Sequence, residues 1–481
     1  MSTLRSTTPP GANEPVETVE TVEPVELTAP DRPTRPGRRA VRRAWDRARD
    51  AVRADPTLVA IVVAAFALRL GWVLVVSTSP PTNFLPSGDQ YSYWYYGREI
   101  AEGHGYVSYV TGQPTAYYPI GFPAILAALF WVVRVTPLPD NYMLAANVLH
   151  VVAGTASVAL AYVIGRRLFG RLGGLLGAVI LAVFPNLVYQ VASLQLETMF
   201  IFWSLAALAI VVAHDWSRGL PSTRRLLVFG FVLGISVLIR PFSIWFVGAL
   251  FVAALVARAG WVRSLRVAAV PLAVVVLMSV PWTVRNAIRM DAFVPTSTNT
   301  GDTLCLDRSL DATGGFRWAD HEGCADPGLP EVERNRENTR MAIEFVIDHP
   351  TRELQQIGRR AKLMFGSDSD GVLAVNTLGG GPVMAEDTAA SLEDVADAAF
   401  DVVMVLAGAG LVLLVASRRR GRPEVALVLL SMGALIAVPL LLWGNPRFHL
   451  PVSPFLAILA GGAMATGIQL FRRRSWRAHL Q

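Results

Sequence analysis

Long apolar segments alternate with short polar ones along most of this chain. Ten of them approach the about 20 apolar residues that a helix needs to cross the hydrocarbon of a membrane. They lie near residues 57–77, 142–164, 168–188, 192–213, 225–239, 241–257, 267–283, 397–417, 423–443 and 451–471. An eleventh apolar piece, 120–133, is shorter and is bounded by prolines. The pattern predicts an all-α polytopic membrane protein with about ten transmembrane helices.

The composition agrees with this class. Of the 481 residues, 53% are hydrophobic and only 17% are charged, whereas a soluble globular protein carries about 25% charged residues. The formal net charge of +6 follows from arginines in the connections between spans. It therefore does not indicate a nucleic-acid partner.

Arginines fall in every second connection between the predicted spans. If residue 1 is cytoplasmic, these basic connections are all on the inside, as the positive-inside rule requires. They contain Arg166, Arg167 and Arg171; Arg218, Arg224 and Arg225; Arg258, Arg263 and Arg266; Arg418, Arg419, Arg420 and Arg422; and Arg472, Arg473, Arg474 and Arg477. Counting 120–133 as a span would reverse all later loops. We therefore predict that it is a juxtamembrane or re-entrant helix on the outer face.

The same pattern predicts four regions. Residues 1–56 form a disordered cytoplasmic tail, because a Pro/Val/Thr/Glu repeat and a run of arginines offer no apolar face. Residues 57–283 form an N-terminal transmembrane catalytic module, 284–395 a long outer-face loop region, and 396–481 the C-terminal transmembrane helices with a basic tail. Within the loop region, apolar spacing predicts a surface helix over 331–365 that is interrupted at His349-Pro350.

Two acids fall on the predicted outer face at the membrane boundary. Asp89 lies in the first outer loop, among aromatic residues and glycines, and Glu197 lies at the outer start of a span. An acid at this depth is costly and is usually paired or functional. The alternatives are a solvated loop acid for Asp89 and, for Glu197, an acid stabilised by the positive N-terminus of a helix. As a catalytic group, Asp89 could take a proton from an acceptor hydroxyl.

Several arginines break the positive-inside trend. Arg240, Arg285 (followed by Asn286) and Arg447 stand at the outer ends of spans. A guanidinium suits bidentate binding of a phosphate, and the alternative is snorkelling to lipid headgroups. Arg69 lies inside the first span, where Glu197 or a lipid phosphate is its candidate partner. We assign these residues to substrate binding.

The first outer loop is rich in tyrosine and tryptophan. Such residues gather at the membrane interface whatever the function, which is the simplest reading for most of them. Tyr91 and Tyr118 are the two that we assign to substrate binding.

Signatures of soluble nucleotide enzymes are missing. The sequence has no P-loop, no Gly-x-Gly-x-x-Gly opening a βαβ unit and no His-Glu-x-x-His. We therefore expect no nucleotide-bound donor and no cofactor, and a histidine-based metal site has little support. Cys305 and Cys324 fall in one polar segment, and we predict a disulfide between them in an oxidising compartment.

The motifs together resemble the GT-C glycosyltransferases, in the branch of the protein O-mannosyltransferases and the lipid A aminoarabinose transferase. They run in order from residue 57 to 471: Asp89-Gln90-Tyr91, Gly103-His104-Gly105-Tyr106, Tyr118-Pro119-Ile120-Gly121-Phe122-Pro123, Glu197-Thr198, Arg240-Pro241, Pro281-Trp282-Thr283-Val284-Arg285-Asn286, and Arg447-Phe448 before Pro451 and Pro454. Each motif is short, so they are more specific for the superfamily than for a substrate.

The resemblance implies a polyprenyl-phosphate sugar donor and an inverting single displacement on the outer face of the cell membrane. Asp89 would be the general base, Glu197 a second acid of the site, and arginines would stabilise the phosphate leaving group. Many members carry an Asp-Glu pair in the first loop, whereas Gln90 follows Asp89 here. The acceptor could be a lipid, a glycan or a protein, and the sugar and any metal requirement stay open. The alternative function is a lipid or glycan transporter or flippase, although no internal repeat supports it.

Overall fold

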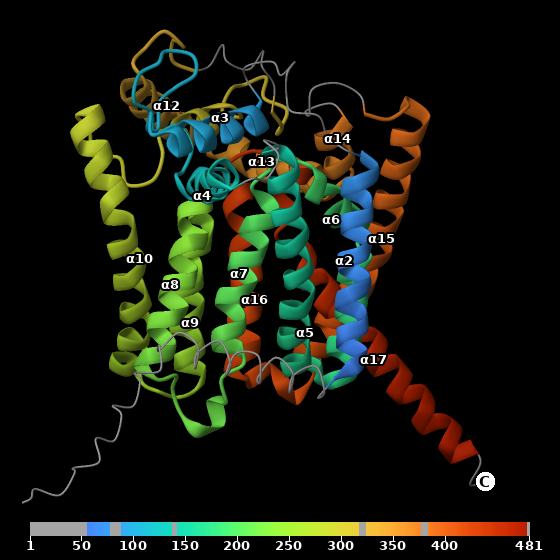
Figure 1. Cartoon of the computed structure of the whole chain (residues 1–481). Coiled ribbons are helices and arrows are strands. Elements are labelled where there is room, and N and C mark those ends of the chain that lie inside the picture. The colour runs from blue at the N-terminus through green and yellow to red at the C-terminus, as the bar shows by residue number, and fades with distance from the viewer. Residues whose placement is uncertain (1–54, 77–87, 137–141, 317–323, 377–382, 479–481) are drawn as a thin grey trace, which may run out of the picture. The chain divides into compact units, whose positions relative to one another are not determined.

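The computed structural model describes residues 55–76, 88–136, 142–316, 324–376 and 383–478. Apart from two isolated bridges, these residues form helices and connections without a strand. Of the expected tail over 1–56, residues 1–54 lie outside the described residues, and Pro56 already begins α2 (Pro56–Val76). The long helices run side by side, and α3 (Asp89–Glu102), α4 (Gly121–Val135), α12 (Glu331–Asp348), α13 (Pro350–Phe365) and α14 (Asp370–Asn376) gather at one end, here termed the α3 end (Figure 1).

The helices of the bundle follow the predicted apolar segments in order. They are α2 (Pro56–Val76), α5 (Tyr142–Ala182), α7 (Glu197–Val212), α8 (Thr223–Ile239), α9 (Trp245–Val256), α10 (Trp261–Met290), α15 (Glu386–Ala416), α16 (Pro423–Leu440) and α17 (Ser453–Ala478). Short pieces join them: α6 (Pro185–Tyr189), η1 (Gln190–Ala192), η2 (Trp216–Arg218), η3 (Pro241–Ile244), α11 (Thr300–Cys305), η5 (Arg418–Gly421) and η6 (Pro446–His449). The all-α polytopic fold is confirmed.

By length and apolar composition, six of the described helices could cross a membrane, or seven if α6–η1 and α7 count as one bent span. The expected number of ten is not confirmed by this measure. One reason is that α7, α8 and α9 have only 16, 17 and 12 residues. Another is that two predicted spans fall within the single 41-residue run of α5.

The run of α5 folds back on itself at Gly170. This residue has φ 84°, outside the helical range, which glycine adopts without steric cost. A Cβ on Gly165 would lie 3.1 Å from the Cα of Gly174, whereas nine residues of straight helix advance about 13.5 Å. The two arms of α5 therefore correspond to the predicted spans near 142–164 and 168–188.

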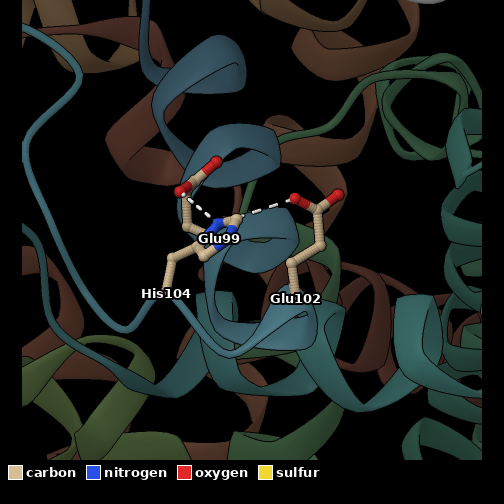
Figure 2. A group of neighbouring side chains, drawn as sticks. All are labelled: Glu99, Glu102 and His104. Atoms are coloured by element: carbon tan, nitrogen blue, oxygen red, sulfur yellow. Dashed lines mark hydrogen bonds and ion pairs between the residues drawn. The ribbon is translucent and has the colours of Figure 1, made fainter.

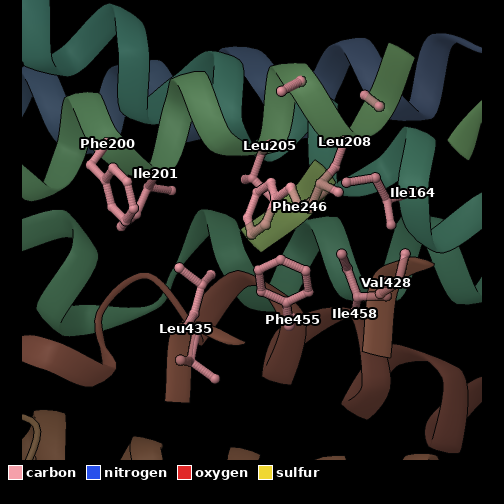
Figure 3. Packing of buried hydrophobic residues seen from close by; sticks show 14 of the residues in the cluster. Ile164, Phe200, Ile201, Leu205, Leu208, Phe246, Val428, Leu435, Phe455 and Ile458 are labelled. Carbon is pink, nitrogen blue, oxygen red and sulfur yellow. The ribbon is translucent and has the colours of Figure 1, made fainter. Parts of the chain in front are cut away.

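The core lies where α5, α7, α9, α16 and α17 meet (Figure 3). Apolar side chains of these five helices interdigitate there, among them Phe200, Phe246 and Phe455. Glycines let α5 and α17 touch backbone to backbone, since a Cβ on Gly461 would lie 2.3 Å from the nitrogen of Gly177. Such small residues at a crossing are typical of helix packing in membranes.

The outlying helices keep apolar faces exposed. Only 22% of the apolar window of α2 and 28% of those of α10 and α15 is buried, against 56% for α5 and α17. Exposed apolar faces of this length suit contact with lipid. The helices α2, α10 and α15 therefore form the periphery of the bundle.

The polar region between α10 and α15 has the helical content that its spacing predicts. Helices α12 and α13 meet at His349-Pro350, where the interruption is expected. Two expected region boundaries fall inside helices, because α10 continues to Met290 and α15 begins at Glu386. The apolar piece 120–133 becomes the 15-residue α4, which lies under α3 across the ends of the bundle helices (Figure 1).

Candidate active site

The two predicted acids meet at the α3 end, although they come from distant parts of the chain. Asp89 is the first residue of α3, after the extended residue Gly88. Glu197 is the first residue of α7 and is fully buried. The sequence breaks the helical pattern just before each acid, so each stands at a helix start, where the helix dipole favours a negative charge.

Arg447 joins the two acids. Its Nη1 donates to Oδ2 of Asp89 at 2.5 Å, and its Nε donates to Oε1 of Glu197 at 2.6 Å. Arg240 donates from Nη2 to the same Oε1 at 2.8 Å. Asp89 also accepts a hydrogen bond from the hydroxyl of Tyr118 at 2.6 Å. Five predicted site residues therefore form one cluster of two acids, two arginines and a tyrosine.

The charges of this cluster influence one another. Burial raises the pKa of the Asp89 carboxyl. The positive charge of Arg447 and the hydrogen bond from Tyr118 lower that pKa by more than burial raises it, so it lies below its usual range. Asp89 is therefore ionised at neutral pH. The Oε2 atom of Glu197 has no hydrogen-bond partner among the described residues, so the cluster keeps some unused bonding capacity.

The cluster opens on a cavity of about 1230 Å³. Asp89, Tyr118, Arg240 and Arg447 lie in its wall, and Glu197 lies behind them. Most of the other wall residues come from loop 108–119, the segments 289–306 and 327–334, and the turn that ends α16. A cavity of this size is large enough for a sugar and a phosphate group.

Arg69 lies elsewhere. It is 1% exposed within α2 and donates to the carbonyls of Ala65, Leu181 and Ala182 at 2.9–3.2 Å. The expected pairing with Glu197 is absent, because Glu197 pairs with Arg240 and Arg447 instead. The physical reason is that the carbonyls at the end of α5 have no partner within the helix and accept the guanidinium instead.

Arg285 and Asn286 also lie outside the cluster. Arg285 donates to the carbonyls of Tyr106 and Thr115 at 2.6 and 2.7 Å, and Asn286 donates to that of Val294 at 2.9 Å. Both residues belong to α10. Arg285 therefore fastens the loop after α3 to α10, and Asn286 holds the segment that follows α10. The structure brings neither residue to Asp89.

Tyr91 lies within a group of rings. Its centroid is 5.1 Å from that of Tyr109, edge to face, and 5.9 and 6.1 Å from those of Trp94 and Tyr95. It does not line the cavity, whereas Tyr118 does. This placement fits the interfacial reading of the tyrosines better than substrate contact.

The contacts of Gln90 give a structural reason for an amide at the position where many members of the resembling family carry a glutamate. Its Nε2 donates to the carbonyl of Ala374, and its Oε1 accepts from the backbone N–H of Leu194, both at 2.8 Å. A carboxylate could accept but not donate. The amide therefore anchors the start of α3, next to Asp89, to α14 and to the segment before α7.

Sequence reasoning missed several buried polar groups near the cluster. Asp370, at the start of α14, is 9% exposed, and its Oδ2 has no hydrogen-bond partner among the described residues. Burial raises the pKa of its carboxyl to about 6, against the opposing charge of Arg447. His449 pairs with Asp368 at 2.6 Å, and both are fully buried. Nothing in the local sequence pattern distinguishes these residues from ordinary polar residues of a loop.

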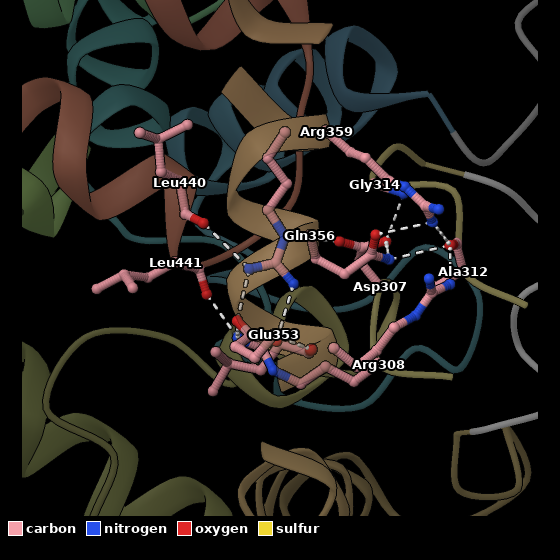
Figure 4. A network of polar contacts seen from close by, with 12 residues as sticks. Asp307, Arg308, Ala312, Gly314, Glu353, Gln356, Arg359, Leu440 and Leu441 are labelled. Atoms are coloured by element: carbon pink, nitrogen blue, oxygen red, sulfur yellow. Dashed lines mark hydrogen bonds and ion pairs between the residues drawn. The ribbon is translucent and has the colours of Figure 1, made fainter. Parts of the chain in front are cut away.

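A second network of charges lies under α13 (Figure 4). Arg360 pairs with Asp307 and Glu353, both at 2.6 Å, and Arg308 pairs with Glu353 at 3.1 Å. The two arginines also donate to the carbonyls of Leu440 and Leu441 at the end of α16. This network holds the segment that leads into Arg447. The seven-residue spacing of Glu353 and Arg360 on one helix face is a signal that could have indicated it.

The predicted disulfide is present. Cys305 and Cys324 are joined with an S–S distance of 2.02 Å. The bond ties the end of α11 to the segment before α12, and both segments border the cavity. The prediction from spacing is confirmed.

Glu99, Glu102 and His104 gather at the C-terminal end of α3 (Figure 2). Within the described ranges, they are the one group of three potential metal ligands, with ligand atoms within 4.8 Å of one another. Arg98 already pairs with Glu99 at 3.0 Å and approaches Glu102 at 3.8 Å. Ten residues of helix, about 15 Å, separate this group from Asp89. A cation bound there would not touch the Asp89 carboxylate.

Comparison with known proteins supports the resemblance. Residues 123–284, roughly a third of the chain, match the family model described as dolichyl-phosphate-mannose-protein mannosyltransferase. This segment includes Glu197 and Arg240 but neither Asp89 nor Arg447. No match to a curated protein was found.

The fold is similar to that of solved structures. The apo crystal structure of the Archaeoglobus fulgidus oligosaccharyltransferase is matched with a TM-score of 0.51 and 16% identity, over 88% of this chain and 52% of that one. ArnT from Cupriavidus metallidurans bound to undecaprenyl phosphate is matched with a TM-score of 0.39 and 14% identity, over 85% and 77%. The chain spans about half the length of the archaeal enzyme. The family segment and the archaeal fold confirm the resemblance to GT-C glycosyltransferases.

Proposed function

We propose that this protein transfers a sugar from a polyprenyl-phosphate donor to an acceptor hydroxyl. The observation that carries the proposal is the bridge from Arg447 to Asp89 and Glu197 in the wall of a large cavity. It joins a candidate base to a candidate phosphate ligand. The matched family description, which names a dolichyl-phosphate sugar, supports this class of donor.

The chemistry is an inverting single displacement. Asp89 takes the proton of the acceptor hydroxyl as its oxygen attacks the anomeric carbon. The bond from that carbon to the phosphate oxygen breaks, and the phosphate leaves with the electron pair. Arg240 and Arg447 offset the negative charge that grows on the phosphate, which is the larger part of such catalysis.

Arg447 links binding to the activation of Asp89. The guanidinium of Arg447 holds the pKa of the Asp89 carboxyl below its usual range. A bound phosphate competes for the same guanidinium. As Arg447 turns to the phosphate, Asp89 loses its nearest positive charge and its pKa rises, which makes it a stronger base. The base is then strongest when the donor is in place.

We place the site on the outer face of the cell membrane. The basic connections of the sequence join the helices at the end opposite the α3 end: the fold-back of α5, the start of α8, the start of α10 and η5 (Figure 1). Clustered arginines favour the cytoplasmic side. The α3 end, with the cavity and the disulfide, then faces outward, where an oxidising environment preserves the disulfide.

The test is transfer from radiolabelled polyprenyl-phosphate sugars in membranes holding equal amounts of wild type, Asp89→Asn or Asp55→Asn. Asp55 is a buried acid paired with Arg171 at the opposite end. We expect transfer by the wild type and by Asp55→Asn, and a loss of about 10²–10⁴-fold in Asp89→Asn. Equal transfer by all three would remove Asp89 from the mechanism. Donor movement across vesicles without transfer would favour the transporter.

A further inference from the structure

The turn that carries Arg447 is held by a buried histidine. His449 ends η6, two residues after Arg447, and is fully buried. Its ring lies between those of Phe400 and Phe365, with centroids 4.5 and 5.9 Å away. Both residues lie in the single turn η6 (Pro446–His449), which Asn445 caps by accepting from the N–H of Arg447 at 2.8 Å. A shift of the histidine would therefore move the arginine.

Both ring nitrogens of His449 face acceptors. Nδ1 lies 2.5 Å from the carbonyl of Met364, and Nε2 lies 2.6 Å from Oδ1 of Asp368. A carbonyl can only accept, so Nδ1 carries a proton. One further proton, carried by either Nε2 or the Asp368 carboxyl, then makes the hydrogen bond between them. The histidine and the aspartate form a buried pair that shares this proton.

Asn186 fixes the carboxylate from the other side. The backbone N–H of Gly371 donates to Oδ1 of Asn186 at 2.6 Å, which orients the amide. Its Nδ2 therefore points at Oδ1 of Asp368 and donates at 2.6 Å. The same carboxylate oxygen thus meets two nitrogens, one from Asn186 and one from His449. A carboxylate satisfies both, whereas an amide at this position cannot.

The segment 366–376 contacts both His449 and Gln90, the residue after Asp89. Asp368 and α14 belong to one short stretch, 366–376, and Gln90 donates to the carbonyl of Ala374 in it. Gln90, which follows Asp89, and His449, two residues after Arg447, are therefore both held by this stretch. Buried hydrogen bonds to this stretch therefore connect the Asp89 side of the cluster with the Arg447 side.

We propose that Asp368 and His449 are positioning residues that hold Arg447 between Asp89 and Glu197. This rests on the proposed function in that Arg447 is assigned to the donor phosphate. Neither residue lines the cavity, so both act through Arg447 and touch no substrate. A misplacement of about 1 Å at a reacting group can cost about 100-fold in rate.

Two variants test the hydrogen-bond argument. In Asp368→Asn, one amide atom must face both an N–H donor of Asn186 and Nε2 of His449, and no tautomer satisfies both without an uncompensated charge. In the double variant Asn186→Asp/Asp368→Asn, the new amide NH₂ donates one hydrogen to the carboxylate at 186. Its other hydrogen goes to Nε2 of a neutral His449. The double variant therefore restores every bond and keeps one acid.

The experiment measures two quantities on purified full-length protein: the Kd for undecaprenyl phosphate, and kcat/KM for transfer from a polyprenyl-phosphate sugar. The proteins are wild type, Asp368→Asn, the double variant, Arg447→Lys, Arg447→Lys/Asp368→Asn, and Asp55→Asn as a control for loss of a buried acid. Each is compared at equal folded amount, judged by thermal unfolding and gel filtration.

We expect Asp368→Asn to weaken the Kd by about tenfold or more and to lower kcat/KM by about 100-fold. The double variant should recover most of both. In the Arg447→Lys background, Asp368→Asn should add less than about threefold, because the group that it positions is already changed.

Each other result has a definite meaning. Independent, multiplying losses in the Arg447→Lys background would overturn the positioning role and show a structural one. Failure of the double variant to recover binding would overturn the proton-sharing argument. Phosphate-lipid binding without transfer by the wild type would sink the proposed transferase, while the binding cycle alone decides the positioning role. A wild type that neither binds nor transfers would overturn both.

Discussion

Two groups of paired charges in this protein have the same composition and different surroundings. The charged members of the candidate active-site cluster are Asp89, Glu197, Arg240 and Arg447, and those of the network under α13 are Asp307, Glu353, Arg308 and Arg360 (Figure 4). The first opens on the large cavity, and no member of the second lines it. In the network, both arginines also donate to the carbonyls that end α16. The difference teaches that access to a cavity, and not the count of acids and arginines, separates a candidate site from a structural clamp.

The variant Arg447→Gln should have the largest effect on this contrast. We expect transfer to fall by about 10²–10³-fold, because one donor to the developing phosphate charge is lost. The fold should persist, since the cavity can admit water to Asp89. The measurement is kcat/KM together with the melting temperature. A large loss of stability without loss of activity in the folded fraction would erase the distinction between the two groups.

Arg360→Met should show the opposite behaviour. It leaves Asp307 and Glu353 buried without their shared partner, which costs about 3–5 kcal/mol of unfolding free energy. Thermal unfolding in detergent should reveal this loss, with activity retained in protein that remains folded. Arg340→Met is the matched control, because Arg340 also pairs with two acids but lies exposed on α12, where ion pairs contribute little. Equal melting shifts in both variants would count against the buried clamp.

Gln90→Glu creates the Asp-Glu pair of the resembling family and should nevertheless lower stability. The new carboxylate cannot donate to the carbonyl of Ala374, so two acceptors face each other, at a cost of about 1–3 kcal/mol. We expect a lower melting temperature and no gain in transfer. Higher transfer by Gln90→Glu would restore the mechanism with two acids in this loop.

The smallest expected effect is a difference between wild type and Arg447→Gln in the pH dependence of kcat/KM. In the free enzyme, the lowered pKa of Asp89 keeps it ionised through neutral and mildly acidic pH. The acid limb of kcat/KM should therefore lie below the ordinary aspartate pKa of about 3.9. Its ion pair stabilises the fold above that pH and is lost as pH falls through the folded pKa. In Arg447→Gln, burial is unopposed by this charge, so the limb should move to higher pH. An unchanged limb would show that another group titrates.

Part of the candidate site follows from local pattern. Asp89 and Glu197 each stand where an apolar or aromatic helix begins, and Arg240 and Arg447 stand at span ends against the charge rule. Their meeting was expected from the shared face. Their roles stay predictions, because geometry alone does not show chemistry. For Arg69 the same reasoning suggested Glu197 as a partner, whereas its guanidinium donates to carbonyls at the end of α5. The sequence does not indicate which backbone carbonyls lack a partner within a helix.

The sequence alone was enough to predict the membrane class, the order of the helices, the interruption at His349-Pro350 and the pairing of Cys305 with Cys324. These depend on hydropathy, helical spacing and nearness along the chain, which are local properties. The sequence could not predict that Arg447 meets Asp89, 358 residues away, or that Arg285 holds the loop after α3. Nor could it predict that the buried His449 pairs with Asp368. A buried polar group takes its partner from whichever segment packs against it, and that choice depends on how distant helices pack.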